Sequence, residues 1–129
     1  MFVGGFPSTV KDGLGGVAGT FARYLLAGFV YTLCGTDFPY GTLAVNLIGC
    51  FLIGFLASLA QEKFLLGPSA RLLLMIGFCG AFTTFSTFML ETANLMKDGE
   101  TWRAFLNVLI SVGVGFVVFR LGVLVAEIL

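Results

Sequence analysis

The stretch GFCGAFTTFSTF, residues 77–88, lies in the middle of a long apolar run and decides how the chain is interpreted. The run as a whole, residues 72–96, is long enough to cross a bilayer, which takes about 20 apolar residues. Gly77 and Gly80 each lower helix propensity by about 1 kcal/mol relative to alanine, and two β-branched threonines follow them. The stretch therefore predicts a membrane-spanning helix with a weak point near its centre.

Three other apolar runs accompany this one in a chain of 129 residues that is 58% hydrophobic and 11% charged, with a mean hydropathy of +1.04. Soluble domains carry about 25% charged residues, so that class is excluded, as is disorder, which requires low hydrophobicity. No run alternates polar and apolar residues as a transmembrane β-strand does. The predicted fold is an all-α membrane protein with one domain, residues 1–129, and transmembrane helices over residues 13–34, 42–60, 72–96 and 104–128.

The ionisable residues and the N-terminal segment exclude several further classes. Seven basic and seven acidic side chains cancel, which leaves no electrostatic footprint for nucleic acid. Histidine, the commonest general base and metal ligand, is absent. The three cysteines lack the spacing of a zinc site and are interpreted as buried thiols. No nucleophile–base pair or phosphate loop is present, and the sequence predicts that the chain is not an enzyme. Residues 1–12 lack a cleavable signal pattern and are interpreted as a short leader or interfacial segment.

The basic residues are spread almost evenly over the two sides of the membrane. With four predicted helices, one side of the membrane holds Lys11, Lys63, Arg71 and Arg120, and the opposite side holds Lys97 and Arg103. The split is four to two if Arg120 counts fully, and three to two if Arg120 lies within the fourth helix. Cytoplasmic loops normally carry an excess of Lys and Arg. Because this bias is weak, the chain can insert in both orientations, and we expect dual topology with antiparallel pairing of two copies.

Polar side chains occur inside the predicted helices, where a charge costs about 2.5–3.5 kcal/mol at the membrane centre. Such groups rarely face lipid; they face a partner, a cavity or a pathway. They are Arg23, Asn46, Thr83, Thr84, Ser86, Thr87, Glu91, Asn107 and Ser111. Four helices leave little room for a lined pathway of their own, which again favours pairing of two copies.

Glycines in the first and third predicted helices indicate close packing or a break. Gly15 and Gly19 are four residues apart and permit close approach of another helix. Around Gly77 and Gly80, one interpretation is an unbroken helix with small residues at a packing face. The other is a break, which would free backbone carbonyls that protein, water or an ion must satisfy. Carbonyls with no carboxylate nearby suit a hard monovalent cation.

Aromatic rings and hydroxyl groups follow these glycines. Phe85 and Phe88 are three residues apart and share a helix face. Thr84 and Thr87 form a second such pair beside them, and Ser86 lies nearly opposite both. Ring edges are weakly positive and hydroxyls donate hydrogen bonds, so this face could accept a small dehydrated anion. Alternatively, the rings are ordinary core residues and the hydroxyls bond to their own helix backbone.

Three motifs, in order along the chain, resemble those of the Fluc/CrcB family of fluoride channels. They are GGxxGxxxRY at residues 15–24, GTLxxNxxG at residues 41–49 and GxxGxxTTFSTF at residues 77–88. The resemblance covers about residues 15–124, with the same four spans. Two positions depart from the family pattern: Ala81 stands where many members have a further glycine, and Gly115 offers no side chain on the fourth helix.

The resemblance implies an antiparallel, dual-topology homodimer with a broken third helix in the inner membrane of a prokaryote. It implies passive export of fluoride through two pores, which lowers cytoplasmic fluoride. It also implies a central structural sodium ion (Na+) held by the backbone carbonyls of Gly80 and Thr83 from both subunits. The residues that it assigns to the fluoride pathway are Arg23, Asn46, Phe85, Ser86, Thr87, Phe88, Glu91 and Ser111, with Thr87 favoured over Ser86 as a donor.

Two other functions fit parts of the sequence. A small proton-coupled drug exporter is also a dual-topology dimer of four-helix subunits, but it needs a carboxylate in the first helix, where this chain has Arg23. A scaffold subunit that transports nothing leaves the polar side chains unexplained. Within the fluoride interpretation, Glu91 is unexpected beside an anion unless it rotates away, accepts hydrogen bonds from hydroxyls or is protonated. The sequence leaves these three explanations open.

Overall fold

The computed structural model describes residues 6–129, and every regular element within that range is a helix. The first two spans are α1, Phe6–Cys34, and α2, Tyr40–Gln61. The third span is assembled from α3 (Pro68–Ala70), η1 (Arg71–Cys79), α4 (Gly80–Phe82) and α5 (Phe85–Lys97). The fourth span comprises α6 (Thr101–Leu109), η2 (Ile110–Val114) and α7 (Gly115–Ile128).

Four helical stretches of the described chain are long and apolar enough to cross a membrane, which confirms the predicted all-helical class with four transmembrane helices. They are Thr9–Cys34, Tyr40–Gln61, Pro68–Lys97 and Thr101–Ile128. The spans predicted from the apolar runs lie inside these stretches, because the helices also include the polar residues that border each run. Of the segment interpreted as a leader, residues 6–12 form the start of α1, and residues 1–5 lie outside the described residues.

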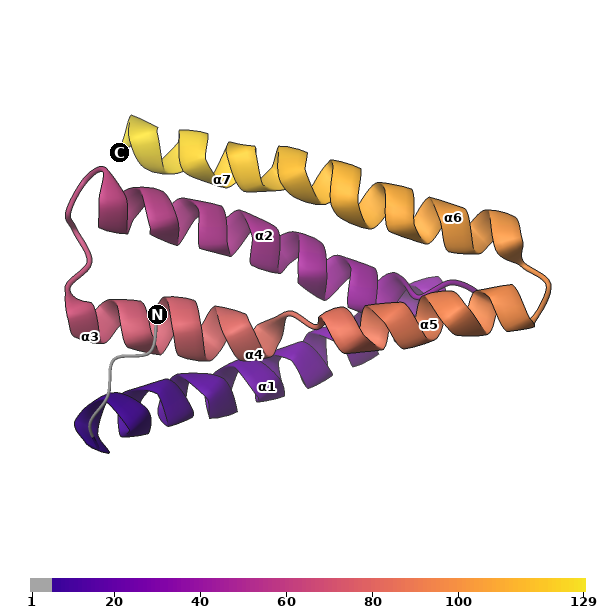
Figure 1. The fold of residues 1–129 in the computed structure, drawn as a ribbon, viewed down its shortest axis with the longest axis horizontal. Helices are drawn as coiled ribbons and strands as arrows, with labels where there is room; N and C mark the ends of the chain where they lie inside the picture. The colour runs from indigo at the N-terminus through magenta and orange to yellow at the C-terminus, as the bar shows by residue number, and fades with distance from the viewer. Residues whose placement is uncertain (1–5) are drawn as a thin grey trace.

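The four spans lie side by side along the longest axis of the molecule (Figure 1). The fourth span runs next to α2, and α1 packs against η1 and α4 of the third span. The start of α1, the connection over residues 62–67 and the C-terminus share one end of the bundle. The connections over residues 35–39 and 98–100 share the other end. Lys63, at one end, lies in a connection, and Lys97, at the other, ends α5, whereas Arg120 lies within α7 and not at an end of the bundle.

Glycines let the spans pack closely at two crossings. A methyl group added at Gly15 or Gly19 would collide with a backbone carbonyl oxygen of η1. This confirms the close approach predicted from the spacing of these two residues. At the second crossing, a methyl group at Gly54 of α2 or Gly122 of α7 would collide with a carbonyl oxygen of the opposite helix. Both crossings therefore require glycine, because any larger residue would collide with the opposite helix.

The outer surface of the bundle is strongly apolar. Large exposed side chains on α1 include Leu14, Val17, Phe21, Leu25 and Phe29. Soluble monomers rarely expose apolar surface of this extent, which marks contact with lipid or with another protein. The surface therefore agrees with a chain that is embedded in a membrane.

The third span is interrupted between α4 and α5. Thr83 has φ −91° and ψ 156°, and Thr84 has φ −147° and ψ 118°, so both residues are extended (Figure 1). The side-chain oxygen of Thr84 accepts a hydrogen bond from the backbone N–H of Thr87 at 3.3 Å and caps α5. The helical pairing predicted for Thr84 and Thr87 is wrong at Thr84, because α5 begins only at Phe85.

Candidate functional site at the interruption of the third span

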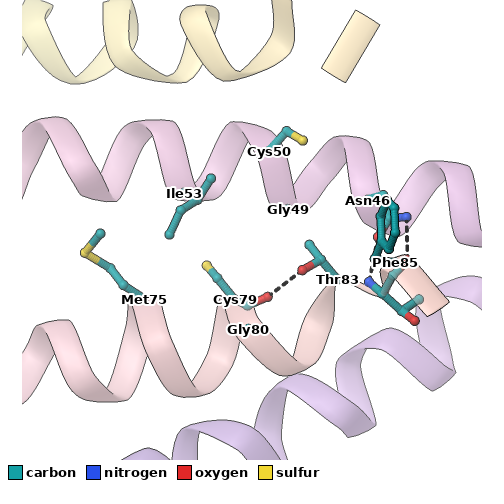
Figure 2. A pocket seen from close by; sticks show the side chains of 10 residues that line it. Asn46, Gly49, Cys50, Ile53, Met75, Cys79, Gly80, Thr83 and Phe85 are labelled. Carbon is teal, nitrogen blue, oxygen red and sulfur yellow. Dashed lines mark hydrogen bonds between the residues drawn. The ribbon is translucent and has the colours of Figure 1, made fainter. Parts of the chain in front are cut away.

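The side chain of Asn46 on α2 pairs with the backbone at the interruption. Its Nδ2 donates to the Thr84 carbonyl at 3.0 Å, and the Thr84 N–H donates to its Oδ1 at 2.8 Å. Figure 2 shows this pair of hydrogen bonds beside the ring of Phe85. Water is scarce at this depth of a membrane, so backbone groups that leave a helix must find protein partners. The amide of Asn46 supplies both partners that Thr84 needs.

The same hydrogen bonds release two backbone carbonyls. In a continuous helix the N–H of residue 84 would bond to the carbonyl of Gly80, and the N–H of residue 87 to the carbonyl of Thr83. Here those two N–H groups donate to Asn46 and to the hydroxyl of Thr84. The hydroxyl of Thr83 itself turns back to the Cys79 carbonyl at 3.0 Å. The carbonyls of Gly80 and Thr83 thereby lose their helical donors.

A first cavity of about 370 Å³ lies between α2 and the third span (Figure 2). Four of the residues assigned from the sequence line it, namely Asn46, Gly80, Thr83 and Phe85. The other lining residues are Gly49, Cys50, Ile53, Met75, Cys79 and Thr84. A methyl group at Gly49 would collide with the Thr83 side chain, so this glycine makes room for the interruption.

A second cavity of about 540 Å³ lies between α1, α2 and α5. It is lined by Arg23, Thr87 and Glu91 among the residues assigned from the sequence, and Thr84 borders both cavities. The Nε of Arg23 is buried and has no hydrogen-bond partner within the described residues. No ion pair joins Arg23 to Glu91 in residues 6–129, although both line this cavity. The cavity therefore holds a cationic group that its own chain does not neutralise directly.

Glu91 accepts hydrogen bonds on both carboxylate oxygens. The hydroxyl of Tyr31 on α1 donates to Oε2 at 2.8 Å, and the hydroxyl of Thr42 on α2 donates to Oε1. Of the three explanations that the sequence left open for this carboxylate, the geometry matches acceptance from hydroxyls. Neither donor was assigned a role from the sequence. Thr42 stands inside a quoted motif, whereas Tyr31 lies 60 residues from Glu91 with no spacing to signal the contact.

Phe85 and Phe88 stand on one side of α5, as their spacing predicts. Their ring centroids are 5.8 Å apart and the planes are inclined by 50°. The ring of Phe88 is 7% exposed, whereas that of Phe85 is 74% exposed and borders the first cavity. The Thr84 hydroxyl donates to the Thr87 hydroxyl oxygen at 3.0 Å, and both residues line the second cavity. Aromatic edges and hydroxyl groups therefore come together at the start of α5.

Comparison with known proteins identifies the family. The sequence profile of the CrcB-like protein family, described as Camphor Resistance (CrcB), matches residues 12–123. The chain belongs to the CrcB family. Relatives from Chlorobaculum tepidum and Geobacter sulfurreducens, each named fluoride-specific ion channel FluC, are both 53% identical to it. The alignments cover 89% and 87% of this chain and 90% of each relative.

A more distant relative carries the same name. The fluoride-specific ion channel FluC of Nitrosococcus oceani is 41% identical over 116 residues, which cover 90% of this chain and 93% of that protein. These names confirm the family resemblance read from the three motifs, and they describe an ion channel and not an enzyme, as predicted for this chain. With four membrane-length helices, this CrcB protein is a multi-pass membrane protein.

The three motifs quoted above pack against one another along the third span, on both sides of the interruption. Gly15 and Gly19 of the first motif pack on the half of the third span that precedes it. In the second motif, Asn46 binds Thr84 and Gly49 faces Thr83. The residues of the first and second motifs therefore pack against the third span or hydrogen-bond to it.

Three residues assigned from the sequence, Ser86, Phe88 and Ser111, line neither cavity. Phe88 is buried within the bundle. Ser86 is exposed on α5 and lines neither of them. Ser111, in η2 of the fourth span, is half-buried, and its Oγ has no hydrogen-bond partner within the described residues. The buried polar side chain that the fourth span does bring to α5 is Asn107, to which no pathway role was assigned.

Proposed function

We propose that this CrcB protein is a fluoride-selective channel that lets fluoride leave the cytoplasm passively and so lowers its concentration there. The observation that carries the proposal is the second cavity, where the Thr87 hydroxyl of α5 and the guanidinium of Arg23 both form part of the lining. The Nε of Arg23 has no hydrogen-bond partner within the described residues, and the first turns of α5 also carry the rings of Phe85 and Phe88. The relatives named fluoride-specific ion channel support the choice of fluoride. Their bacterial origin supports a prokaryotic inner membrane as the location.

The groups around the second cavity suit a small anion. Arg23 supplies positive charge in a region of low dielectric constant, which offsets part of the cost of removing fluoride from water. The Thr87 hydroxyl lines this cavity and is a hydrogen-bond donor. The second N–H of the Asn46 amide is a further donor, at the first cavity. Phe85 lines the first cavity and its ring packs against that of Phe88, so the ring edges add weak positive potential on that side of α5. Ser86 and Ser111 would contribute only where a second copy of the chain completes the pathway.

Glu91 does not have to oppose an anion in this arrangement. Both of its oxygens accept hydrogen bonds from Tyr31 and Thr42, so its charge is turned toward these two hydroxyls. These two hydrogen bonds use the only proton of each hydroxyl. Tyr31 and Thr42 therefore donate hydrogen bonds to Glu91 and hold it in place, and they do not donate to fluoride.

The carbonyls of Gly80 and Thr83 fit a structural sodium ion. Both have lost their helical donors, and no carboxylate lines the first cavity, so the available ligands are neutral oxygens, which suit a monovalent cation. The same pair from a second copy of the chain would complete the set at the dimer centre. A bound sodium ion would supply positive charge and hold the two interruptions together. Replacing sodium by N-methylglucamine is expected to lower the melting temperature of the purified protein.

We further propose an antiparallel homodimer of dual topology with two pores. A single chain exposes Gly80 and the ring of Phe85, and a second copy packed there would enclose both. The even spread of basic residues over the two ends supports insertion in both orientations. Each interface between antiparallel copies would then form a fluoride path, with residues of both chains along it.

A flux assay tests the channel function directly. Purified protein is reconstituted into liposomes loaded with potassium fluoride, and release is followed with a fluoride-selective electrode after valinomycin is added. Fluoride is expected to leave rapidly, whereas liposomes loaded with chloride should release it far more slowly. Protein-free liposomes are the control for leakage. Equal rates for the two anions, or no fluoride release by folded protein, would overturn the proposal.

A further inference from the structure

A buried polar relay connects the fourth span to the ring-bearing part of α5. Asn107 of α6 is 2% exposed, and its Nδ2 donates to the Thr92 hydroxyl oxygen at 2.9 Å. The Thr92 hydroxyl in turn donates to the Phe88 carbonyl at 2.7 Å. A hydroxyl has one proton, and Thr92 donates it to the Phe88 carbonyl. Toward Asn107 the Thr92 oxygen can therefore act only as an acceptor. The relay therefore has one direction, from Asn107 to the backbone of Phe88.

α5 needs external support because the interruption detaches it from α4. Helical hydrogen bonds stop at Thr83 and Thr84, so the preceding helix does not fix the rotation of α5 about its own axis. Three side-chain contacts replace that connection. Asn46 of α2 holds Thr84, the residue that caps α5. Hydroxyls of α1 and α2 hold Glu91, and Asn107 of the fourth span holds Thr92.

Two of these contacts resist rotation from different directions. Glu91 and Thr92 are consecutive, so their side chains leave the helix about 100° apart. A contact on Glu91 alone would allow α5 to pivot about that side chain, and a contact on Thr92 alone would do the same. Together they set one orientation, and this orientation decides where the ring of Phe88 and the carboxylate of Glu91 stand.

We infer that Asn107 is a positioning residue for the fluoride pathway, acting through Thr92 and the Phe88 carbonyl rather than by touching the anion. This inference rests on the proposed channel function. It assigns the fourth span a task that differs from lining the pathway through Ser111. The loss of one interhelical hydrogen bond in a membrane changes the equilibrium that it supports by about three- to thirty-fold. A released α5 would move the ring away from the anion and loosen selectivity.

Single-channel recording separates positioning from a loss of folded protein. The number of active channels changes the total flux, but it does not change the current through one open channel or its ratio of fluoride to chloride permeability. Asn107→Leu removes the donor at nearly constant size, and Thr92→Val removes the hydroxyl at constant shape. We expect each variant to lower the fluoride current per channel, or the permeability ratio, by about threefold or more.

Matched variants complete the test. Thr92→Ser keeps the hydroxyl and is expected to retain the wild-type current, and Thr101→Val, at an exposed position on α6, is expected to change nothing. The double variant Asn107→Leu/Thr92→Val should be no worse than the more impaired single variant, since both break one relay. If Asn107→Leu fails to fold, the comparison of the fluoride current of Thr92→Val with that of Thr92→Ser tests the inference instead.

Three outcomes would overturn the inference. The first is a folded Asn107→Leu channel with wild-type current and permeability ratio. The second is equal behaviour of Thr92→Val and Thr92→Ser. The third is a folded wild-type protein that conducts no fluoride, which overturns the proposed function and the inference with it and is seen before any variant is measured.

Discussion

Asn46 and Thr84 exchange two hydrogen bonds, one from the side-chain amide to the backbone carbonyl at 3.0 Å and one from the backbone N–H to the side-chain oxygen at 2.8 Å. An amide side chain offers a donor and an acceptor side by side, as a peptide group does. Asn46 therefore acts as a substitute peptide for a residue that has left the helix. This exchange lets two extended residues exist within a membrane span.

The first prediction concerns this pairing. Asn46→Asp keeps the acceptor for the Thr84 N–H but places a carboxylate oxygen against the Thr84 carbonyl. We expect a loss of stability of about 1–3 kcal/mol and a loss of fluoride flux, because the new charge also repels the anion. Thermal unfolding and liposome flux measure the two effects. Asn94→Asp, at an exposed position on α5, is the control, and full conduction by Asn46→Asp would contradict a place for Asn46 beside the path.

Features of the site that depend on local spacing could be predicted from the sequence. Gly15 and Gly19 lie on one helix face whatever the partner is, and the structure places them against η1. Phe85 and Phe88 likewise share a side of α5. Thr84 and Thr87 do pair, but Thr84 does so as the cap of α5 and not as a helical residue. No local rule shows at which residue a helix resumes after an interruption.

Contacts between distant helices could not be predicted in this way. Tyr31 of α1 meets Glu91 of α5, and Asn107 of α6 meets Thr92 of α5, only because the packing of the helices brings them together. A lone hydroxyl or amide in an apolar helix indicates that some partner exists, without indicating which one. The identity of that partner is a property of the packed bundle.

The second prediction compares aromatic residues in matched pairs. Phe88 and Phe82 are both buried, at 7% and 3% exposure, so isoleucine at either position loses similar packing. Phe85 and Phe105 are both exposed, at 74% and 54%. If ring edges contribute to the path, Phe88→Ile should reduce fluoride flux more than Phe82→Ile, and Phe85→Ile more than Phe105→Ile. Liposome flux, normalised to folded protein, measures all four variants, and equal effects within each pair would refute the role of the rings.

The third prediction concerns the hydroxyl of Tyr31. Tyr31→Phe keeps the ring but leaves Oε2 of Glu91 without its donor, so the carboxylate charge is less well balanced beside the anion. A hydrogen bond to a charged group contributes about 1.5–3 kcal/mol, so we expect fluoride flux to fall by about tenfold or more. Tyr40→Phe, at the start of α2 where the ring contacts Phe38, is the matched control. Similar flux through both variants would show that Glu91 does not need this donor.

The fourth prediction concerns the orientation of the chain in the membrane. The basic residues at the two ends of the bundle differ little in number, so neither end is held strongly in the cytoplasm. A topology reporter fused after Leu129 should therefore be active on both sides of the membrane within one cell population. Adding two arginines after Gly67, at the end that carries the C-terminus, should bias the chain toward one orientation and lower fluoride flux, since an antiparallel pair needs both orientations. Co-expression with a copy biased the opposite way should restore the flux. A wild-type reporter found on one side only would exclude the antiparallel pair, whatever the flux assay shows.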